Sequence, residues 1–443
     1  MEDKDIIAAI ATAPGNGAIG IVRVSGGGVG LLVKSIFRGA SQLKSHQMYY
    51  GKIISGGSVV DEVMLCFMQA PRTYTMEDTV EIFAHGGRFV LSSVLDAVLE
   101  AGARLAHPGE FTKRAFLNGR INLTQAEGVM DVINAETAAA QRIGLSKLGG
   151  GLSLRIEEIR TKILSWIAHI ELSIDYPEHE EEAKNLAEIL AESGEIIAKL
   201  EALISTSNTG RIITEGVRTA IIGRPNAGKS TLLNAILSED RAIVHEEAGT
   251  TRDVLTERVV VGNVPLLLMD TAGIRDTDNF VEKIGVEKSL NAAKDAELVL
   301  YLIDSTVGLM PEDETIVKTL AGKPVIKIFT KADIVEKNEA HCVSAVTGQG
   351  LQELYTKIEN VCLAGIGDTV DETEIITRKR HRLLLEEALQ HVKNAVDAIQ
   401  AYIMEDLVSI ELRGAYLALG HILGMEVADD ILDRIFAEFC LGK

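Results

Sequence analysis

The chain has 443 residues and a formal net charge of −20, and 47% of its residues are hydrophobic. This length exceeds what one hydrophobic core serves, so two or three domains are expected. The acidic balance argues against a protein that coats nucleic acid non-specifically, because such binding depends on neutralising phosphates, although a locally basic face could still bind RNA. Aromatic residues make up 4% of the chain, which favours helices over a sandwich or barrel.

The cysteines are scattered and form no C-x-x-C pair and no zinc-type spacing: Cys66, Cys342, Cys362 and Cys440. This usage is typical of a reduced, cytoplasmic protein. The first five residues are mostly charged, and no apolar run is long enough to cross a bilayer. We therefore expect neither a signal peptide nor a membrane span.

Residues 1–118 are predicted to form a mixed α/β domain. Strands are expected at 18–24, 48–54, 63–68 and 79–83, with an amphipathic helix at 89–101. Two of these strands carry one charge each in an apolar setting, Arg23 and Glu81. A charge that alternates with apolar residues usually marks the solvated face of a strand, and the pattern alone favours that interpretation over a functional one.

From Gly109 onward the periodicity becomes helical and stays so to about residue 210. The expected helices are 110–118, 124–148, 154–174 and 187–205. The acidic run 177–182 is interpreted as a solvated helix start. The polar stretch 205–210 predicts a domain boundary.

Residues 211–370 alternate strand and helix, which predicts a parallel sheet. A hairpin is expected from 259–261 to 266–268, and later strands at 298–303, 324–329 and 342–343. After residue 371 the pattern is helical again, at 378–402, 407–423 and 429–439. These last helices need a partner face, and the helices of 119–210 offer one.

The expected domains are therefore 1–118, 119–210, 211–370 and 371–443, with the third inserted into a helical domain built from the second and fourth. A basic run, Arg378–Arg382, opens the last of these segments. It either touches RNA or solvates a helix start, and the sequence favours the second interpretation.

The stretch Gly223–Ser230 fits G-x-x-x-x-G-K-[ST], the phosphate-binding P-loop. An apolar strand, 219–222, comes before it, and a helix, 231–237, comes after it. Glycines let backbone N–H groups and the positive end of the helix face an anion. Lys229 is expected to reach the β- and γ-phosphates and Ser230 to hold Mg²⁺.

Four further stretches occur in the order that a guanine-nucleotide domain needs: 249–253, 270–273, 330–333 and 344–346. Thr251 is the candidate switch threonine for the Mg²⁺ shell, and Asp270 the candidate for its outer shell. The Asp333 carboxylate can accept both guanine N–H groups, which selects GTP over ATP. The usual motif has asparagine where this chain has Thr330, and threonine has fewer groups with which to tie this loop to the P-loop.

The hydrolytic residues depart from the common pattern, because the position after Gly273 is Ile274 and not the usual glutamine. Glu282 is the candidate that orients the attacking water. The candidates that stabilise transition-state charge are Arg224, Arg252 and Arg275. For each arginine, a phosphate-edge or surface contact is an equally good interpretation.

Several of these features together resemble one family: the P-loop with Asn226, the stretch 249–253, Ile274, Glu282 within 281–285, and the terminal Phe439–Lys443. The resemblance extends along the whole chain, including 108–111 and 114–118. The family is MnmE, also called TrmE, the tRNA uridine-modification GTPases.

The resemblance implies an α/β multidomain fold with three parts. These are an α/β tetrahydrofolate-binding-like N-terminal domain that forms a homodimer, an all-α helical domain, and a Ras-like P-loop GTPase domain inserted in the helical domain. It assigns 5-formyl- or methylene-tetrahydrofolate to Arg23, Glu81, Arg120 and Lys443. Relatives carry lysine where this chain has Arg120, so the charge is kept and the contact geometry differs.

In the family, K⁺ takes the role that an arginine finger plays elsewhere, and two G domains meet across it. The implied K⁺ ligands are Asn226, His245, Glu247 and Thr250, and the Mg²⁺ ligands are Ser230 and Thr251. The residues expected at GTP are Asn226, Ala227, Gly228, Lys229, Ser230, Thr231, His245, Glu246, Glu247, Ala248, Gly249, Thr250, Thr251, Asp270, Thr271, Ala272, Gly273, Thr330, Lys331, Asp333, Ser344, Ala345 and Val346.

Family members also work with a flavin-dependent partner, MnmG (GidA). The implied reaction places a carboxymethylaminomethyl- or aminomethyl-type group at carbon 5 of the wobble uridine of certain tRNAs, with a folate one-carbon unit. Cys440 lies in an apolar helical end, and a packed thiol is favoured over a nucleophile there.

Two other functions compete with this one. A regulatory GTP-binding protein of ribosome assembly would carry similar G-domain motifs, but it has no reason to bind folate. A stand-alone folate-dependent methyltransferase would leave a complete GTPase domain unexplained. A folate titration separates the first of these from the family reading.

Overall fold

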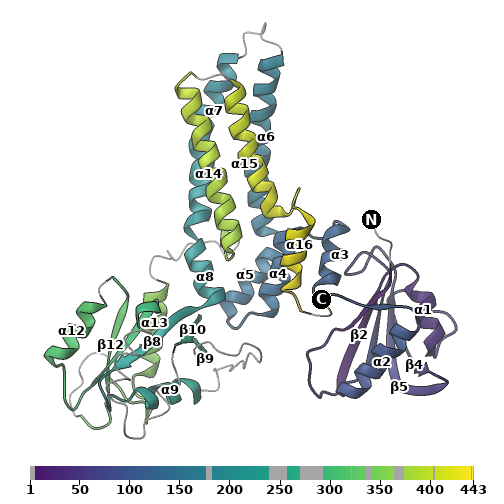
Figure 1. Ribbon diagram of the computed structural model, residues 1–443, viewed down its shortest axis with the longest axis horizontal. Coiled ribbons are helices and arrows are strands. Elements are labelled where there is room, and N and C mark those ends of the chain that lie inside the picture. The colour runs from purple at the N-terminus through teal and green to yellow at the C-terminus, as the bar shows by residue number, and fades with distance from the viewer. Residues whose placement is uncertain are drawn as a thin grey trace. The chain divides into compact units, whose positions relative to one another are not determined.

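The computed structural model describes residues 5–175, 182–238, 257–269, 293–320, 322–335, 342–363, 374–402, 405–440 and 442 (Figure 1). The chain divides into two compact units. The first joins Met1–Met130 with Gly420–Lys443, and the second is Asp131–Leu419. No helix of the described residues is long and apolar enough to cross a membrane.

The first unit contains a seven-stranded sheet in the order β3-β4-β5-β6-β2-β1-β7. Its strands are β1 (Ile7–Ile10), β2 (Ile19–Ser25), β3 (Phe37–Arg38), β4 (Gln47–Ser55), β5 (Ser58–Met68), β6 (Thr79–His85) and β7 (Arg104–Leu105). All neighbours are antiparallel except β1 and β7. The four expected strands are present, while β1, β3 and β7 are short and were not predicted.

Two helices, α1 (Val29–Ile36) and α2 (Arg88–Glu100), cover one face of this sheet and share its core. The approach of α2 to β2 depends on Gly20, where an added Cβ would lie 2.4 Å from Leu91 Cδ1. Any larger residue there would push the helix away from the sheet. Successive side chains of β2 and β6 point to opposite faces of the sheet. One face therefore packs against α1 and α2, and the other is available for different contacts.

A second, smaller core of the first unit joins segments far apart in the sequence. It is formed by α3 (Glu110–Leu117), α4 (Leu123–Ile133) and α16 (Asp429–Ala437). Gly109 adopts a left-handed φ of 67°, and an added Cβ would lie 2.4 Å from the Phe436 carbonyl oxygen. Close backbone approach thus holds the C-terminal helix next to α3.

Long helices of the second unit run alongside one another: α6 (Gly151–Asp175), α7 (Glu182–Ser205), α14 (Lys379–Gln400) and α15 (Glu405–Leu423) (Figure 1). Two shorter helices, α5 (Ala138–Leu148) and α8 (Ser207–Glu215), belong to the same unit. α7 packs against both α6 and α14, so helices before and after the strand-rich segment form one bundle. Trp166, Leu200 and Leu385 are among its fully buried side chains.

One helix expected at 124–148 is instead two, because α4 ends at Ile133 and α5 begins at Ala138. Thr137 is extended (φ −127°, ψ 155°) and its hydroxyl accepts a hydrogen bond from the Ala140 N–H. This is the N-cap of α5, so a new helix starts here, four residues after α4 ends. The apolar periodicity of the sequence continues across the break, so the pattern alone did not predict two helices.

The second unit also contains a six-stranded sheet in the order β13-β12-β11-β8-β10-β9. Its strands are β8 (Val217–Gly223), β9 (Glu257–Val261), β10 (Val264–Leu268), β11 (Leu298–Asp304), β12 (Val325–Thr330) and β13 (Cys342–Val343). All neighbours are parallel except the predicted hairpin β9–β10. The associated helices include α9 (Lys229–Ser238), α12 (Pro311–Thr319) and α13 (Leu351–Cys362).

The chain enters and leaves this sheet at one place. The Thr206 hydroxyl donates to the Glu374 carbonyl at 3.1 Å and accepts from the Ile376 N–H at 3.0 Å. Gly210 packs so closely that an added Cβ would lie 2.2 Å from the Ile376 carbonyl oxygen. These contacts join the two ends of the strand-rich segment, as an inserted domain requires. The domain boundaries given above stay predictions.

Candidate functional site

The P-loop leaves the carboxyl end of β8, a strand that lies inside the sheet between β11 and β10. Two of its residues have left-handed backbones, Asn226 at φ 61° and Gly228 at φ 85°. The first helical bond follows at once, from the Leu232 N–H to the Gly228 carbonyl. In such a loop the free N–H groups and the positive end of α9 face the same space, which suits a phosphate.

Lys229 is the first residue of α9, and its ammonium group points back over the loop. Nζ lies 2.9 Å from the carbonyl oxygens of both Gly223 and Arg224. Burial lowers the pKa of this lysine. Removing an ammonium from water is unfavourable without a counter-charge, so a polyphosphate in the loop would stabilise the charged form.

Thr330, at the end of β12, makes the tie that the usual asparagine would make. Its buried hydroxyl lies 2.8 Å from the Ala227 carbonyl oxygen and 3.2 Å from that of Ile303. The first contact joins the base-binding loop to the P-loop, and the second joins it to β11. The shorter side chain therefore keeps the connection, because the two loops approach closely at this point.

The loop after β12 is arranged by two side-chain contacts. Lys331 has a left-handed φ of 61°, and its Nζ lies 2.6 Å from Asp304 Oδ2. Ser344 donates from its hydroxyl to Asp333 Oδ1 at 2.6 Å. The Asp333 carboxylate is thus held at the edge of the sheet where the P-loop also emerges. Ligands of parallel α/β sheets bind at this edge.

Arg224 lies in the P-loop, and its side chain binds residues outside the loop. Its Nε lies 3.0 Å from Oδ1 of the fully buried Asp313, and its Nη2 donates to the Gly308 carbonyl at 2.8 Å. The hydroxyl of Tyr301 also donates to Asp313, at 2.7 Å. The structure gives this arginine a role that neither interpretation named, because it anchors the P-loop to the start of α12.

Many expected site residues lie outside the part of the chain that the structure describes: His245, Glu246, Glu247, Ala248, Gly249, Thr250, Thr251, Arg252, Asp270, Thr271, Ala272, Gly273, Ile274, Arg275, Glu282 and Lys443. Among the described residues, Asn226–Thr231, Thr330–Asp333 and Ser344–Val346 meet at the carboxyl edge of one sheet.

A second group of expected residues meets in the first unit. Arg23 on β2 and Glu81 on β6 are direct cross-strand partners, and their side chains pair at 2.8 Å. Both are about four-fifths buried, with 18% and 20% of the side chain exposed. The interpretation favoured by the sequence pattern, that these charges mark a solvated strand face, is therefore wrong. A partly buried ion pair occupies this face of the sheet.

Tyr74 connects this pair to Arg120. The guanidinium carbon of Arg120 lies 4.8 Å from the centre of the Tyr74 ring, and that of Arg23 lies 5.6 Å from it. Arg120 also donates to the Tyr74 carbonyl at 3.0 Å. Sequence reasoning missed Tyr74 because it lies in a loop after β5, where no periodic pattern marks it.

The end of the chain reaches the same place. Arg23 Nη1 donates to the Gly442 carbonyl at 3.3 Å. Gly442 has φ 88°, and an added Cβ would lie 2.3 Å from the Ile10 carbonyl oxygen, so only glycine fits here. The thiol of Cys440 is exposed, which contradicts the packed thiol favoured by the sequence.

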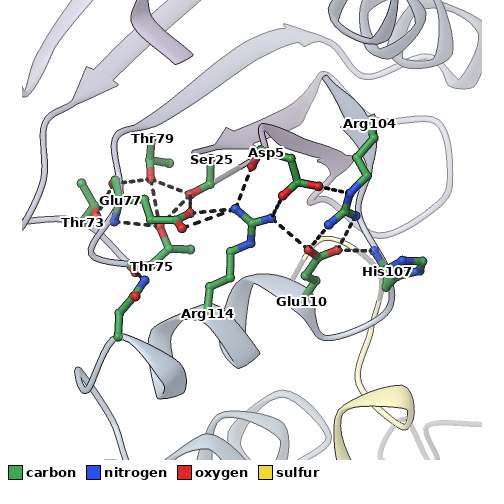
Figure 2. A network of polar contacts seen from close by, with 11 residues as sticks. Asp5, Ser25, Thr73, Thr75, Glu77, Thr79, Arg104, His107, Glu110 and Arg114 are labelled. Carbon is green, nitrogen blue, oxygen red and sulfur yellow. Dashed lines mark hydrogen bonds and ion pairs between the residues drawn. The ribbon is translucent and has the colours of Figure 1, made fainter. Parts of the chain in front are cut away.

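Figure 2 shows a polar network around Glu110 and Arg114 of α3, in the same unit. Glu110 accepts hydrogen bonds from Arg104 at 2.6 and 2.8 Å, from the His107 N–H at 2.8 Å and from Arg114 at 3.0 Å. Burial opposes ionisation of this carboxylate, but these donors outweigh burial and hold its pKa at about 2. The network fixes the start of α3.

The same network extends through Arg114 to Asp5, to Glu77 in the loop before β6, and to Ser25 at the end of β2. This guanidinium donates to Glu77 at 3.1 Å and to Asp5 at 2.7 Å, and the Ser25 hydroxyl donates to Glu77 at 3.1 Å (Figure 2). α3 also carries Phe111, whose ring centre lies 5.8 Å from the Arg23 guanidinium carbon. The network therefore holds in place an aromatic ring that contacts the Arg23–Glu81 pair.

Comparison with known proteins finds relatives along nearly the whole chain. Residues 6–120 match the family model described as GTP-binding protein TrmE N-terminus, and residues 123–440 match the MnmE helical domain. A tRNA modification GTPase MnmE from Thermoanaerobacter sp. (strain X514) is 44% identical over 99% of both chains. Proteins of the same name from Acetivibrio thermocellus and Listeria welshimeri are 42% and 43% identical, over 100% and 99% of both chains.

Among solved structures, Aquifex aeolicus Era bound to GDP and aluminium fluoride matches 40% of this chain and 67% of its own, at 26% identity. Its TM-score of 0.26 is too low to support an argument. The MnmE proteins, in contrast, share more than 40% of their residues with this chain over its whole length, which is sufficient to assign a family. The chain therefore belongs to the MnmE family of tRNA modification GTPases, as its motifs predicted.

Proposed function

We propose that this protein hydrolyses GTP in the cytoplasm to drive modification of carbon 5 of the wobble uridine in certain tRNAs. The observation that carries the proposal is the arrangement at the carboxyl edge of the six-stranded sheet. There the P-loop, Thr330 and Asp333 lie within one hydrogen-bonded framework. The family membership of the whole chain supports the tRNA part of the proposal.

The residues present fit a guanine nucleotide. The P-loop offers N–H groups and Lys229 to the phosphates, while the Asp333 carboxylate accepts the two guanine N–H groups. Ser230 and Thr251 would hold Mg²⁺, with Asp270 in its outer shell, and the ion would neutralise charge on the phosphates. Glu282 would orient the attacking water, and Arg252 and Arg275 are the candidates for further charge stabilisation.

K⁺ binding would explain how charge is stabilised without a finger arginine from a partner. Asn226 is exposed on the P-loop and has a left-handed backbone that turns this part of the loop outward. It would hold the ion together with His245, Glu247 and Thr250, and a fixed cation there offsets charge that develops between the β- and γ-phosphates. Two G domains of a homodimer would meet across it.

The test compares GTP hydrolysis in KCl and in NaCl at equal ionic strength. Wild type is expected to be stimulated by K⁺, and Asn226→Ala to lose the stimulation while it still binds nucleotide. Asn263→Ala is the matched control, because this asparagine lies in the β9–β10 turn and bonds Glu359. Equal rates in the two salts for wild type would refute the K⁺ part and shift the role to an arginine.

The first unit would bind tetrahydrofolate, as its 5-formyl or methylene form, through Arg23, Glu81, Arg120 and Lys443. The arrangement fits the ligand's chemistry, because the Tyr74 ring offers an aromatic surface and the arginines offer partners for carboxylates.

Folate titration tests this proposal with wild type, Arg120→Ala and the control Arg88→Ala. Arg88 is an exposed residue at the start of α2. Weaker binding in Arg120→Ala alone is expected; no binding by wild type would favour a regulatory GTPase.

The modification itself would need a flavin-dependent partner, MnmG (GidA), and GTP hydrolysis would move the helices that contact it. This relay is a population shift between two arrangements of the molecule. It predicts that Glu282 variants lose hydrolysis and tRNA modification together. Independent loss of the two activities would contradict the relay.

A further inference from the structure

A cavity of about 370 Å³ lies in the second unit, between α8 and the start of α14. Its lining residues are Ser207, Asn208, Arg211, Glu215, Thr377, Arg378, Lys379, Arg382, Leu383 and Glu386. Cationic side chains outnumber acidic ones in this lining, although the chain as a whole has a net charge of −20. Four cationic side chains, Arg211, Arg378, Lys379 and Arg382, thus gather at one cavity of an acidic chain, and the nucleotide site uses none of these residues.

Three of the arginines are held in place by acidic neighbours. Arg378 pairs with the buried Asp131 at 2.7 Å and Arg211 with Glu297 at 2.7 Å. Arg382 pairs with Glu386, one turn further along the helix, at 2.8 Å. A guanidinium group has five N–H donors, and the ion pairs of Arg211 and Arg382 use only part of them, so these two arginines keep donors for a ligand. The ion pairs therefore orient these arginines for a further anion.

Lys379 adds a positive charge that no described acidic residue neutralises. Its side chain is exposed, and it forms no ion pair with any residue that the structure describes. It also opens α14, whose first turn contains no acidic residue and whose N-cap, Arg378, makes no side-chain capping bond. Cations at the positive end of a helix repel the helix dipole. A bound anion would relieve this repulsion at the mouth of the cavity.

We propose that this cavity binds phosphate groups of the tRNA backbone, so that the corner formed by α8 and α14 is an RNA contact of the second unit. The proposal rests on the proposed function, which supplies tRNA as the substrate. Phosphate is the anion that several guanidinium groups recognise best, through paired N–H donors. The sequence alone favoured a solvated helix start for Arg378–Arg382. The cavity and its fixed arginines reverse that preference.

The test measures the affinity of the full-length protein for an unmodified tRNA transcript as a function of KCl concentration. Variants are Lys379→Ala, Arg382→Ala and the double variant. Each lost phosphate contact is expected to reduce the slope of log Kd against log salt by about 1, and to weaken binding at fixed salt. Lys393→Ala is the matched control. It lies on the same helix outside the cavity lining, with 43% of its side chain exposed, and is paired with Glu201 at 2.7 Å.

Lys379 and Arg382 are exposed, so their variants are expected to fold and to hydrolyse GTP like wild type, which is measured in parallel. A double variant that binds tRNA with the wild-type slope overturns the cavity as an RNA contact and leaves the proposed function intact. Wild type that binds no tRNA at all overturns both. Equal weakening in Lys393→Ala would show a general charge effect and would also overturn the proposal.

Discussion

At the scale of single residues, Thr330 shows how a motif can change while its contact is kept. Asparagine is the usual residue because its amide can form a hydrogen bond with the P-loop. From the sequence alone, it was open whether threonine could make the same connection. The structure shows the threonine hydroxyl 2.8 Å from the Ala227 carbonyl oxygen, with 5% of the residue exposed. One hydroxyl proton is sufficient because the distance is already that of a direct hydrogen bond.

Thr330→Val tests this contact with a side chain of nearly the same shape. It removes the only donor and leaves the Ala227 carbonyl without this partner, which costs about 1–2 kcal/mol. Nucleotide dissociation constants are therefore expected to rise roughly five- to thirtyfold. Titration with fluorescent GDP measures the change, and Thr330→Ser, which keeps the hydroxyl, is the control. Unchanged affinity in Thr330→Val would show that the hydroxyl does not tie the two loops.

At the scale of elements, the sequence predicted the main strands and helices because their periodicity is local. The break between α4 and α5 was missed because a cap, Thr137, interrupts a continuous apolar pattern. β1 was missed because it is only four residues long, and its pairing with β2 and β7 depends on distant chain segments. Arg23 and Glu81 were correctly singled out as departures, but their mutual pairing needs the register of β2 and β6.

Tyr74 could not be found from the sequence for a related reason. It lies in a loop, and only the fold brings its ring beside Arg23 and Arg120. Motifs with fixed local spacing, such as the P-loop, were located in full because strand, loop and helix follow one another directly in the chain. The described part of the nucleotide site was thus predictable, whereas the surroundings of the Arg23–Glu81 pair were only partly so.

The network around α3 gives a prediction at this scale. Glu110 has its pKa lowered from 4.5 to about 2 in the folded protein. A depressed carboxylate pKa means that the unfolded chain binds the proton more readily, so the stabilisation is present above pH 4.5 and is lost as the pH falls towards 2. The shift corresponds to a contribution on the order of 3 kcal/mol at neutral pH.

Glu110→Gln is expected to lower the stability of the first unit at pH 7 and to flatten its dependence on pH below 4.5. Calorimetric melting of the full chain at several pH values measures both effects, and Glu438→Gln, at an exposed position on the C-terminal helical end, is the control. If Glu110→Gln melted in parallel with wild type across this range, the ion pairs to Arg104 and Arg114 would not stabilise the fold.

At the scale of the whole molecule, the G-domain sheet is connected to the helices through β9. Arg258 on this strand pairs with Glu136, between α4 and α5, at 2.6 Å, and donates to the Thr214 carbonyl of α8 at 3.0 Å. Glu136 has only 11% of its side chain exposed, so solvent screens the pair weakly. β9 is the first described strand after the expected switch stretch 249–253, which places this link where nucleotide-dependent movement would first reach the helices.

Removing the link is therefore expected to separate hydrolysis from modification. Arg258→Ala should keep GTP hydrolysis within about twofold of wild type, because its described side-chain partners are Glu136 and Thr214 and not nucleotide-site residues, while tRNA modification falls. The charge-swapped pair Arg258→Glu with Glu136→Arg should restore part of the modification activity, with a coupling energy of about 0.5–3 kcal/mol in a double-mutant cycle.

Arg218→Ala serves as the control, since Arg218 lies on β8 of the same sheet and pairs with Glu297, but its side chain is 57% exposed. Removal of an exposed ion pair changes little. If Arg258→Ala and Arg218→Ala modified tRNA equally well, movement would not pass through β9. Two other described links would then be candidate routes from the G domain into the helices: the junction of Thr206 with Glu374 and Ile376, and the ion pair of Arg211 on α8 with Glu297.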